Sequence, residues 1–150
     1  MATPHAPRSG SPRFRRLVAP LALVLAAAAL SACDARVRRI RSRLSGQELI
    51  LFDRGREVSS QCWACHDFYG TQNRVGPYLS GLYGRRAGSA NFGGYSIALR
   101  STAAVWDDRT LDAFLADPQR FAPGTTMMSP GVSDPADREA LIFYIKQVTR

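Results

Sequence analysis

A five-residue motif, Cys62-Trp63-Ala64-Cys65-His66, constrains this chain more than any other part of its sequence. The spacing Cys-x-x-Cys-His is the attachment signature of c-type haem. The two thiols are about one helical turn apart, so both can reach the two vinyl groups on one haem edge. The adjacent imidazole of His66 then lies under the iron as its proximal ligand. The motif predicts one covalently attached haem c, held by Cys62 and Cys65.

A Cys-x-x-Cys pair has two other common uses, as a redox pair and as half of a zinc site. A thioredoxin-like redox pair follows a strand in a βαβ context, whereas the sequence around this motif is typical of helix and loop. A zinc site needs a second pair of Cys or His ligands, and the only other histidine in the chain is His5. The motif therefore favours haem over either alternative.

An iron held by His66 needs a sixth ligand or keeps an open site. Met127 and Met128 are the candidates, in a segment that contains Pro123, Gly124 and Pro130. Such a segment has little core to fill, but it can fold over the far face of a haem. A thioether ligand favours Fe(II) and raises the reduction potential.

The first 32 residues predict an export signal. Residues 1–16 contain four arginines and no acid, and residues 17–30 are apolar except for Pro20. This is the pattern of a signal peptide, and the apolar run is shorter than the roughly 20 residues of a membrane span. Leu30-Ser31-Ala32-Cys33 resembles the bacterial lipobox, which implies diacylation of Cys33. An ordinary signal peptide and an uncleaved anchor helix are the alternatives.

The charge of the chain is unevenly distributed. The net charge is +8, yet residues 44–150 carry 11 basic and 11 acidic residues. A neutral domain argues against a nucleic-acid-binding protein. We expect a signal peptide over residues 1–32, a lipidated cysteine with a basic tether over residues 33–44, and one folded domain over residues 45–150. The tether arginines could lie on anionic lipid headgroups or be solvated.

The folded domain is predicted to be all-α. Ser45-Gly46-Gln47-Glu48 matches a capping box that opens a helix to about Ser60, with Gly55 at a close helix crossing. Residues 67–105 are rich in glycine and predict loop. A short helix is expected at residues 110–116, and the last helix starts at Asp134-Pro135. An apolar face on that helix is expected to meet the first helix near Gly55; it comprises Leu141, Tyr144 and Ile145.

With these motifs in place, residues 46–150 resemble a class I bacterial cytochrome c of the mitochondrial-like type. The likeness rests on four stretches beside the haem motif: residues 55–58, residues 74–85 with the pattern G-P-x-L-x-G-x-x-G-R, residues 95–99 with Trp106, and the P-G-T-x-M pattern of residues 123–127. The resemblance implies the small class I cytochrome c fold, with helices and loops wrapped around one covalently attached haem.

The resemblance also assigns roles to residues of the haem pocket. It implies that the Pro77 carbonyl accepts a hydrogen bond from His66 and that Met127 is the second axial ligand. It places Arg85, Tyr95 and Trp106 near the haem propionates and the hydroxyl of Thr125 near the ligand loop. Two positions depart from the family pattern: Phe114 stands where many members have a tyrosine bonded to the methionine sulfur, and Ser59 replaces a common aromatic residue.

A haem with both axial positions filled moves electrons and has no open site for substrate. We therefore expect an electron carrier and not an enzyme. By resemblance it would work between a cytochrome bc complex and a terminal oxidase or photosynthetic reaction centre, with redox proteins as partners. It would be lipid-anchored at the periplasmic face of the bacterial inner membrane. The alternatives are a haem subunit of a periplasmic dehydrogenase, and a haem sensor or peroxidase with a labile methionine.

Overall fold

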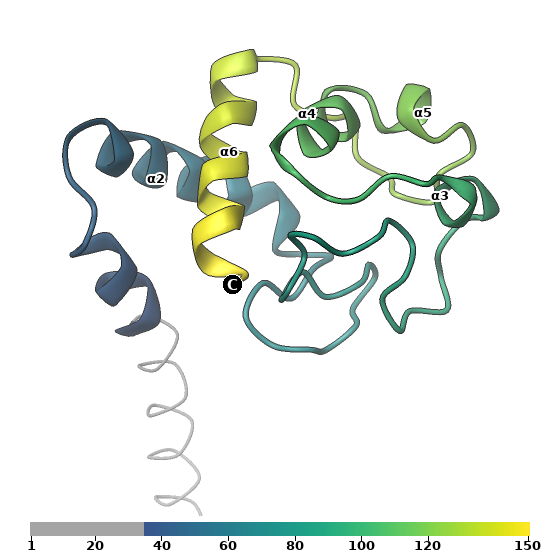
Figure 1. Ribbon diagram of the computed structural model, residues 1–150, viewed down its shortest axis with the longest axis horizontal. Helices are drawn as coiled ribbons and strands as arrows, with labels where there is room; N and C mark the ends of the chain where they lie inside the picture. Colours follow the sequence, from purple (N-terminus) through teal and green to yellow (C-terminus); the bar gives the residue numbers. More distant parts are fainter. Residues whose placement is uncertain (1–34) are drawn as a thin grey trace, which may run out of the picture. The chain divides into compact units, whose positions relative to one another are not determined.

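The computed structural model describes residues 35–150 (Figure 1). Residues 37–150 belong to one unit and residues 1–36 to another. The expected signal peptide and Cys33 lie outside the described residues. Part of the expected tether belongs to the folded unit, because residues 35–41 are helical and Val37 is buried. Within residues 35–150, no helix has the length and apolar character that crossing a membrane requires.

Helices and loops make up the folded unit. The labelled helices are α2 (Gly46–Val58), the 3-10 helix η1 (Ser59–Cys62), α3 (Ile97–Ser101), α4 (Asp108–Ala116), α5 (Pro118–Phe121) and α6 (Pro135–Val148). Over residues 35–150 the only β pairing is an isolated bridge between Arg86 and Val105. The all-α prediction is confirmed.

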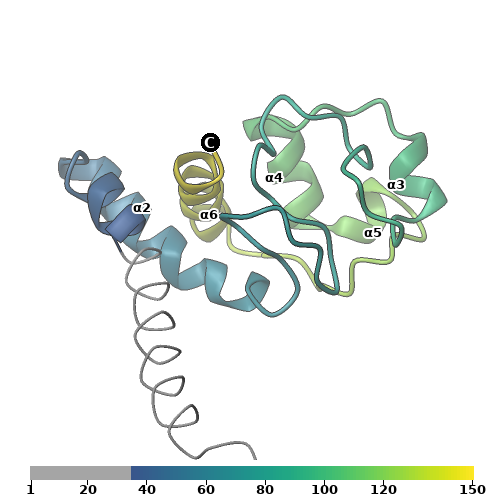
Figure 2. The ribbon, with the colours of Figure 1, turned by 90° about the horizontal axis from the view of Figure 1, so that it is seen from below.

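The two long helices, α2 and α6, cross each other (Figures 1 and 2). Gly55 of α2 permits the crossing, because a Cβ added there would collide with the Ala140 carbonyl oxygen and lie 2.7 Å from the Tyr144 Cβ. The predicted face of α6 is fully packed, with Leu141, Tyr144 and Ile145 all buried. Both the close crossing at Gly55 and the apolar face were correctly predicted.

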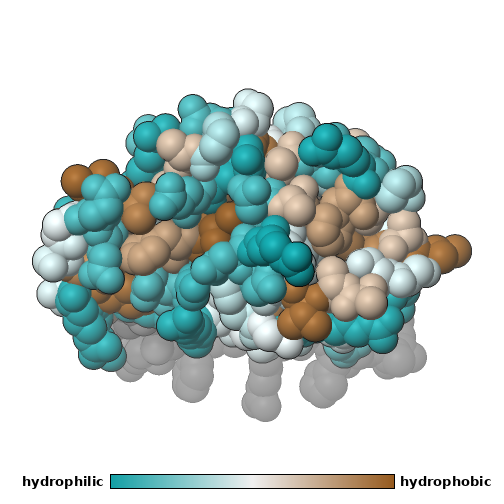
Figure 3. Space-filling model, turned by 45° about the horizontal axis from the view of Figure 1, so that its top comes forward, coloured by the Kyte–Doolittle hydropathy of each residue, from teal (hydrophilic) through white to brown (hydrophobic). Residues whose placement is uncertain are grey.

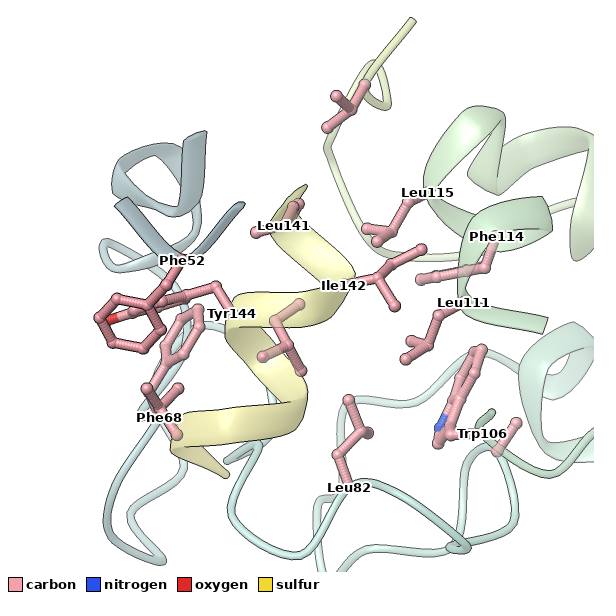
Figure 4. Packing of buried hydrophobic residues seen from close by; sticks show 14 of the residues in the cluster. Phe52, Phe68, Leu82, Trp106, Leu111, Phe114, Leu115, Leu141, Ile142 and Tyr144 are labelled. Carbon is pink, nitrogen blue, oxygen red and sulfur yellow. The ribbon is translucent and has the colours of Figure 1, made fainter. Parts of the chain in front are cut away.

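Helix α6 is buried on two sides (Figure 4). On one side its Tyr144 ring packs against Phe52 of α2, with 5.1 Å between the ring centroids. On the other side, Leu111 and Phe114 of α4 face Ile142. The region beyond α4 holds Trp106, α3, α5 and the long loops. Because α6 joins the α2 half of the unit to the α4 half, it holds the haem-motif cysteines and the methionine loop in one structure.

Side chains at the helix starts fix where α4 and α6 begin. Asp107 and Thr110 form a capping box at α4, and Asp134 accepts hydrogen bonds from two backbone N–H groups at the start of α6. The capping box predicted at Ser45 is wrong. Gly46 has φ +52°, so the first turn of α2 is irregular, and the Glu48 N–H donates to the Ser45 carbonyl at 3.1 Å instead of to its side chain.

Candidate functional site

A cavity of about 350 Å³ is the centre of the candidate site. Three stretches of chain supply most of its polar and sulfur atoms: residues 61–66, residues 75–79 and residues 125–130. Apolar side chains line most of the remainder: Leu82, Phe92, Leu99, Trp106, Leu111, Phe114, Leu115 and Ile145. Residues that are up to 84 positions apart in the sequence therefore meet around one largely apolar space. Such a space suits a large flat apolar cofactor with a few fixed polar contacts.

The two cysteines line this cavity together. Cys62 ends η1, and the N–H groups of Cys65 and His66 donate to the Cys62 carbonyl at 3.2 and 3.0 Å, so the motif makes a helical turn. Burial, reinforced by the neighbouring Cys65, raises the pKa of the Cys62 thiol to about 11. No strand precedes the motif in residues 35–150, whereas a thioredoxin-like pair follows one, so the structure argues against that alternative. In the described part of the chain, no three His, Cys, Asp or Glu residues gather as a metal site would require.

The His66 ring is held in one orientation. Its Nδ1 lies 2.7 Å from the Pro77 carbonyl oxygen, and since a carbonyl can only accept, Nδ1 carries the proton. Burial lowers the pKa of His66, with the bond to Pro77 acting in the opposite direction. The neutral ring is left with a lone pair on Nε2. A fixed tautomer with one free nitrogen is the form in which histidine binds a metal.

Gly76 completes the support of this ring. A Cβ at Gly76 would collide with the Cε1 atom of His66 and lie 2.9 Å from its Nδ1. The Gly76 N–H donates to the Cys65 carbonyl at 2.8 Å, which draws residues 74–77 against the motif. The backbone at Gly76 and Pro77 therefore confines the imidazole by contact as well as by a hydrogen bond.

The two methionines differ in their surroundings. The Met127 side chain is half-buried and packs against the core, whereas Met128 is 98% exposed. The Met127 N–H donates to the Thr125 hydroxyl at 3.4 Å. Thr125 itself is buried and lines the cavity. Both methionines line the cavity, and Met127 is the less exposed of the two.

Arg85, Tyr95 and Trp106, expected near the propionates, all line the cavity. The Arg85 guanidinium donates to the carbonyls of Ser80 and Tyr78 at 3.1 and 3.0 Å. Burial raises the pKa of Tyr95, and the nearby Arg85 charge partly offsets this effect. The two side chains therefore face the same cavity.

The two departures from the family pattern have local consequences. Phe114 is buried at the cavity and packs on Trp106 and Phe121, with ring centroids 5.2 and 5.4 Å apart. It offers the Met127 sulfur no hydroxyl. Ser59 is fully buried, and its hydroxyl accepts a hydrogen bond from the Trp63 indole at 3.0 Å. A small residue at position 59 thus leaves room for the tryptophan inside the haem motif.

Sequence reasoning missed the residues that secure the methionine loop. The Gln119 amide donates to the Thr125 carbonyl at 3.1 Å and accepts from the Gly124 N–H at 3.2 Å. The Thr126 hydroxyl donates to the Gly94 carbonyl at 2.9 Å. A lone glutamine carries no local signal for such a role, because its partners are set by how the loop folds.

The residues fit a covalently attached haem. The cavity offers two neighbouring thiols, one imidazole with a free Nε2, one half-buried thioether and an apolar lining. These are the donors that a c-type haem uses.

Comparisons with known proteins agree with this assignment. The sequence profile of the family described as cytochrome c matches residues 52–149. The chain is 38% identical over 96 residues to cytochrome c2 of Rhodoblastus acidophilus, covering 63% of this chain and 90% of that protein. It is 40% identical over 87 residues to cytochrome c2 iso-2 of Magnetospirillum fulvum, covering 58% and 91%. Cytochrome cH from Methylobacterium extorquens has a similar structure, with a TM-score of 0.59, 40% identity, and coverage of 63% and 96%.

Proposed function

Because this chain belongs to the cytochrome c family, we propose that it carries single electrons between other redox proteins. The observation that carries the proposal is the shared lining of one cavity by Cys62, Cys65, His66 and Met127. Two of these residues supply sulfur for covalent attachment, and the other two supply one nitrogen and one sulfur donor for an iron.

Each residue has a distinct task in this proposal. Cys62 and Cys65 hold the haem through thioether bonds, and the bound haem supplies an iron that gains or loses one electron. His66 presents Nε2 because Pro77 holds the proton on Nδ1. Met127 presents its thioether from a loop that Thr125 and Gln119 secure. If His66 and Met127 both held the iron, no coordination site would be left for a substrate.

The polar lining would hold the acidic edge of the haem. Arg85 retains N–H groups beyond the two that donate to backbone carbonyls. Tyr95 and Trp106 add a hydroxyl and an indole N–H at the same cavity. A buried tryptophan needs a polar partner for its indole N–H, and a propionate would supply one for Trp106. The positive charge of Arg85 would offset the propionate charge.

The proposed location is the periplasmic face of the bacterial inner membrane, with a lipid anchor at Cys33. The apolar run of residues 17–30 and the lipobox-like end at Cys33 support this location. The proposed partners are redox proteins of the same membrane, a cytochrome bc complex on one side and a terminal oxidase or reaction centre on the other. Sharing a membrane raises the effective concentration of carrier and partner, which suits a domain of zero net charge.

Carbon monoxide binding and the ferric spectrum test the axial ligands. The haem-loaded wild-type protein should show the red methionine–iron charge-transfer band and should not bind carbon monoxide when reduced. Met127→Leu should lose the band and bind carbon monoxide. Met128→Leu, an exposed control one residue away, should behave as wild type. Carbon monoxide binding by the reduced wild type would instead favour a sensor or peroxidase.

A reduced-minus-oxidised spectrum of cell fractions tests the anchor. The haem signal should lie in the membrane fraction for the wild-type chain and should be lost from it in Cys33→Ala. A signal that stays in the membrane fraction after this substitution would refute anchoring by lipid.

A further inference from the structure

The segment that leaves the expected membrane anchor is packed onto the haem domain. Val37 is 5% exposed, and Ile40 and Leu44 pack against the same buried cluster. Val37, Ile40 and Arg41 lie at positions i, i+3 and i+4 of the helical residues 35–41, so they share one face. Residues 37–44 are therefore attached along their length to the unit that holds the haem cavity.

An ion pair fixes the same segment to α2. The Nε and Nη2 atoms of Arg41 each donate to one carboxylate oxygen of Asp53, both at 2.8 Å. The bidentate arrangement sets the direction as well as the distance between the two side chains. Hydrogen bonding to Arg41 lowers the pKa of Asp53. Helix α2 continues through η1 to Cys62. Residues 37–44 are therefore paired with the helix that leads to the haem attachment.

The outer face of this segment is basic. Arg38, Arg39 and Arg43 are exposed, and Arg38 and Arg39 lie on the helix turn away from Val37. Figure 3 shows hydrophilic side chains with a few hydrophobic ones between them at the left end, the end at which residues 37–44 lie in Figure 1. A guanidinium group binds phosphate oxygens in pairs, so three exposed arginines suit a surface of phosphates.

We propose that Arg38, Arg39 and Arg43 bind the headgroups of anionic phospholipids and thereby fix the orientation of the haem domain on the membrane. The proposal rests on the membrane location proposed above. The apolar run ends at Leu30, so these arginines follow it by only 8 to 13 residues. Residues 33–43 have a net charge of +4, whereas residues 44–150 have none. Of the residues that follow the expected signal peptide, this short segment is thus the part that an anionic bilayer attracts.

The rigid attachment distinguishes this surface from a basic tether. A flexible tether would hold the haem near the bilayer in every orientation. A segment fixed by Val37 and by the Arg41–Asp53 pair transmits its own orientation to α2. Each arginine near an anionic surface strengthens binding by about fivefold, so three give roughly 100-fold at low ionic strength. That factor is enough to make one orientation dominant.

Haem orientation in aligned bilayers tests the proposal with the full, haem-loaded chain. Linear dichroism would be measured in phosphatidylcholine bilayers with and without phosphatidylglycerol. We expect an ordered haem only when phosphatidylglycerol is present, with order lost in 0.5 M salt because screening weakens surface charge. The triple variant Arg38→Gln, Arg39→Gln, Arg43→Gln should lose this order. The control Arg109→Gln, Arg120→Gln, Arg150→Gln removes the same charge from exposed positions elsewhere and should keep it.

A second variant separates rigid mounting from simple attraction. The double variant Val37→Ser, Asp53→Asn removes the buried side chain and the pair with Arg41 but leaves the three lipid-facing arginines in place. It should keep the phosphatidylglycerol-dependent protection of residues 38–43 from hydrogen exchange while the haem becomes disordered. Equal haem order in both lipids, or equal behaviour of the two triple variants, would overturn the proposal. If the haem-loaded wild-type chain had a normal spectrum but did not stay bound to either kind of bilayer, the proposed membrane anchor would be wrong. The proposed orientation by the three arginines would then be wrong as well.

Discussion

Replacing Gly55 by alanine tests the helix crossing on which the whole site depends. The added Cβ would collide with the Ala140 carbonyl oxygen and lie 2.7 Å from the Tyr144 Cβ. Neither atom sits at the end of a flexible side chain, so α2 and α6 must move apart. The separation would also loosen the contact of Phe52 with Tyr144, now 5.1 Å between ring centroids.

Two opposing contributions set the change in the free energy of unfolding caused by Gly55→Ala. Alanine is favoured over glycine inside a helix by about 1 kcal/mol. Overpacking of a well-packed core costs about 1–3 kcal/mol, and a clash with backbone belongs at the upper end. The net loss of unfolding free energy should be about 2 kcal/mol. For a unit of this size the melting temperature should fall by roughly 8 °C.

Thermal unfolding of the haem-loaded protein, followed by far-UV circular dichroism, measures the effect. Gly93→Ala is the control, because a Cβ there meets no atom within 4 Å and its φ is not positive. Its melting temperature should be close to that of wild type. A Gly55→Ala protein as stable as wild type, or more stable, would show that the two helices separate at little cost and would refute the reasoning.

Three further predictions follow from other contacts. Gly76→Ala should displace the His66 ring and weaken its hydrogen bond to Pro77. The NMR chemical shifts of the His66 imidazole in the haem-loaded protein would reveal this displacement. Unchanged chemical shifts would contradict the packing described at Gly76. Asp134→Ala should lower the urea midpoint of unfolding, whereas Asp134→Asn should retain most of it, because only the asparagine keeps an acceptor for the two N–H groups at the start of α6. The pKa of Asp108 is lowered below 3.8, mainly by Lys146, so the ion pair should contribute about 0.5 kcal/mol at neutral pH after allowance for its exposure. Since the folded-state pKa is depressed, the part of the stability difference between wild type and Lys146→Met that the ion pair supplies should be lost as the pH falls through the folded pKa of Asp108. A difference of the same size at pH 7 and at pH 2 would exclude this pair as its source and would assign it to pH-independent contacts of Lys146, such as that with the Tyr83 ring.

The accuracy of the sequence predictions varied with the range of the interaction. The helix at Asp134-Pro135 and the face of Leu141, Tyr144 and Ile145 were predicted correctly, because capping and periodicity are local properties. The capping box at Ser45 failed although its residues fit the pattern. Its neighbour Gly46 adopts φ +52°, a conformation that only glycine takes readily and that a residue pattern does not reveal.

Within the candidate site, too, local features were predictable from the sequence and long-range contacts were not. The haem-attachment roles of the cysteines and His66 were predicted from spacing alone, since covalent attachment requires fixed positions in the chain. The choice between Met127 and Met128 came from a family pattern, and the structure supplies a physical reason in their different exposure. The roles of Gly76 and Gln119 were not predicted, because each acts on residues brought near it by folding.

By itself, the sequence determined the cofactor class, the all-α character and the segregation of positive charge into the first 43 residues, since each depends on residue type and short-range order. The tertiary structure alone decided that residues 37–44 are part of the folded unit. Burial of Val37 and pairing of Arg41 with Asp53 depend on which surface α2 presents. No count of charges could distinguish this packed basic segment from a solvated tether, because the distinction lies in long-range contacts.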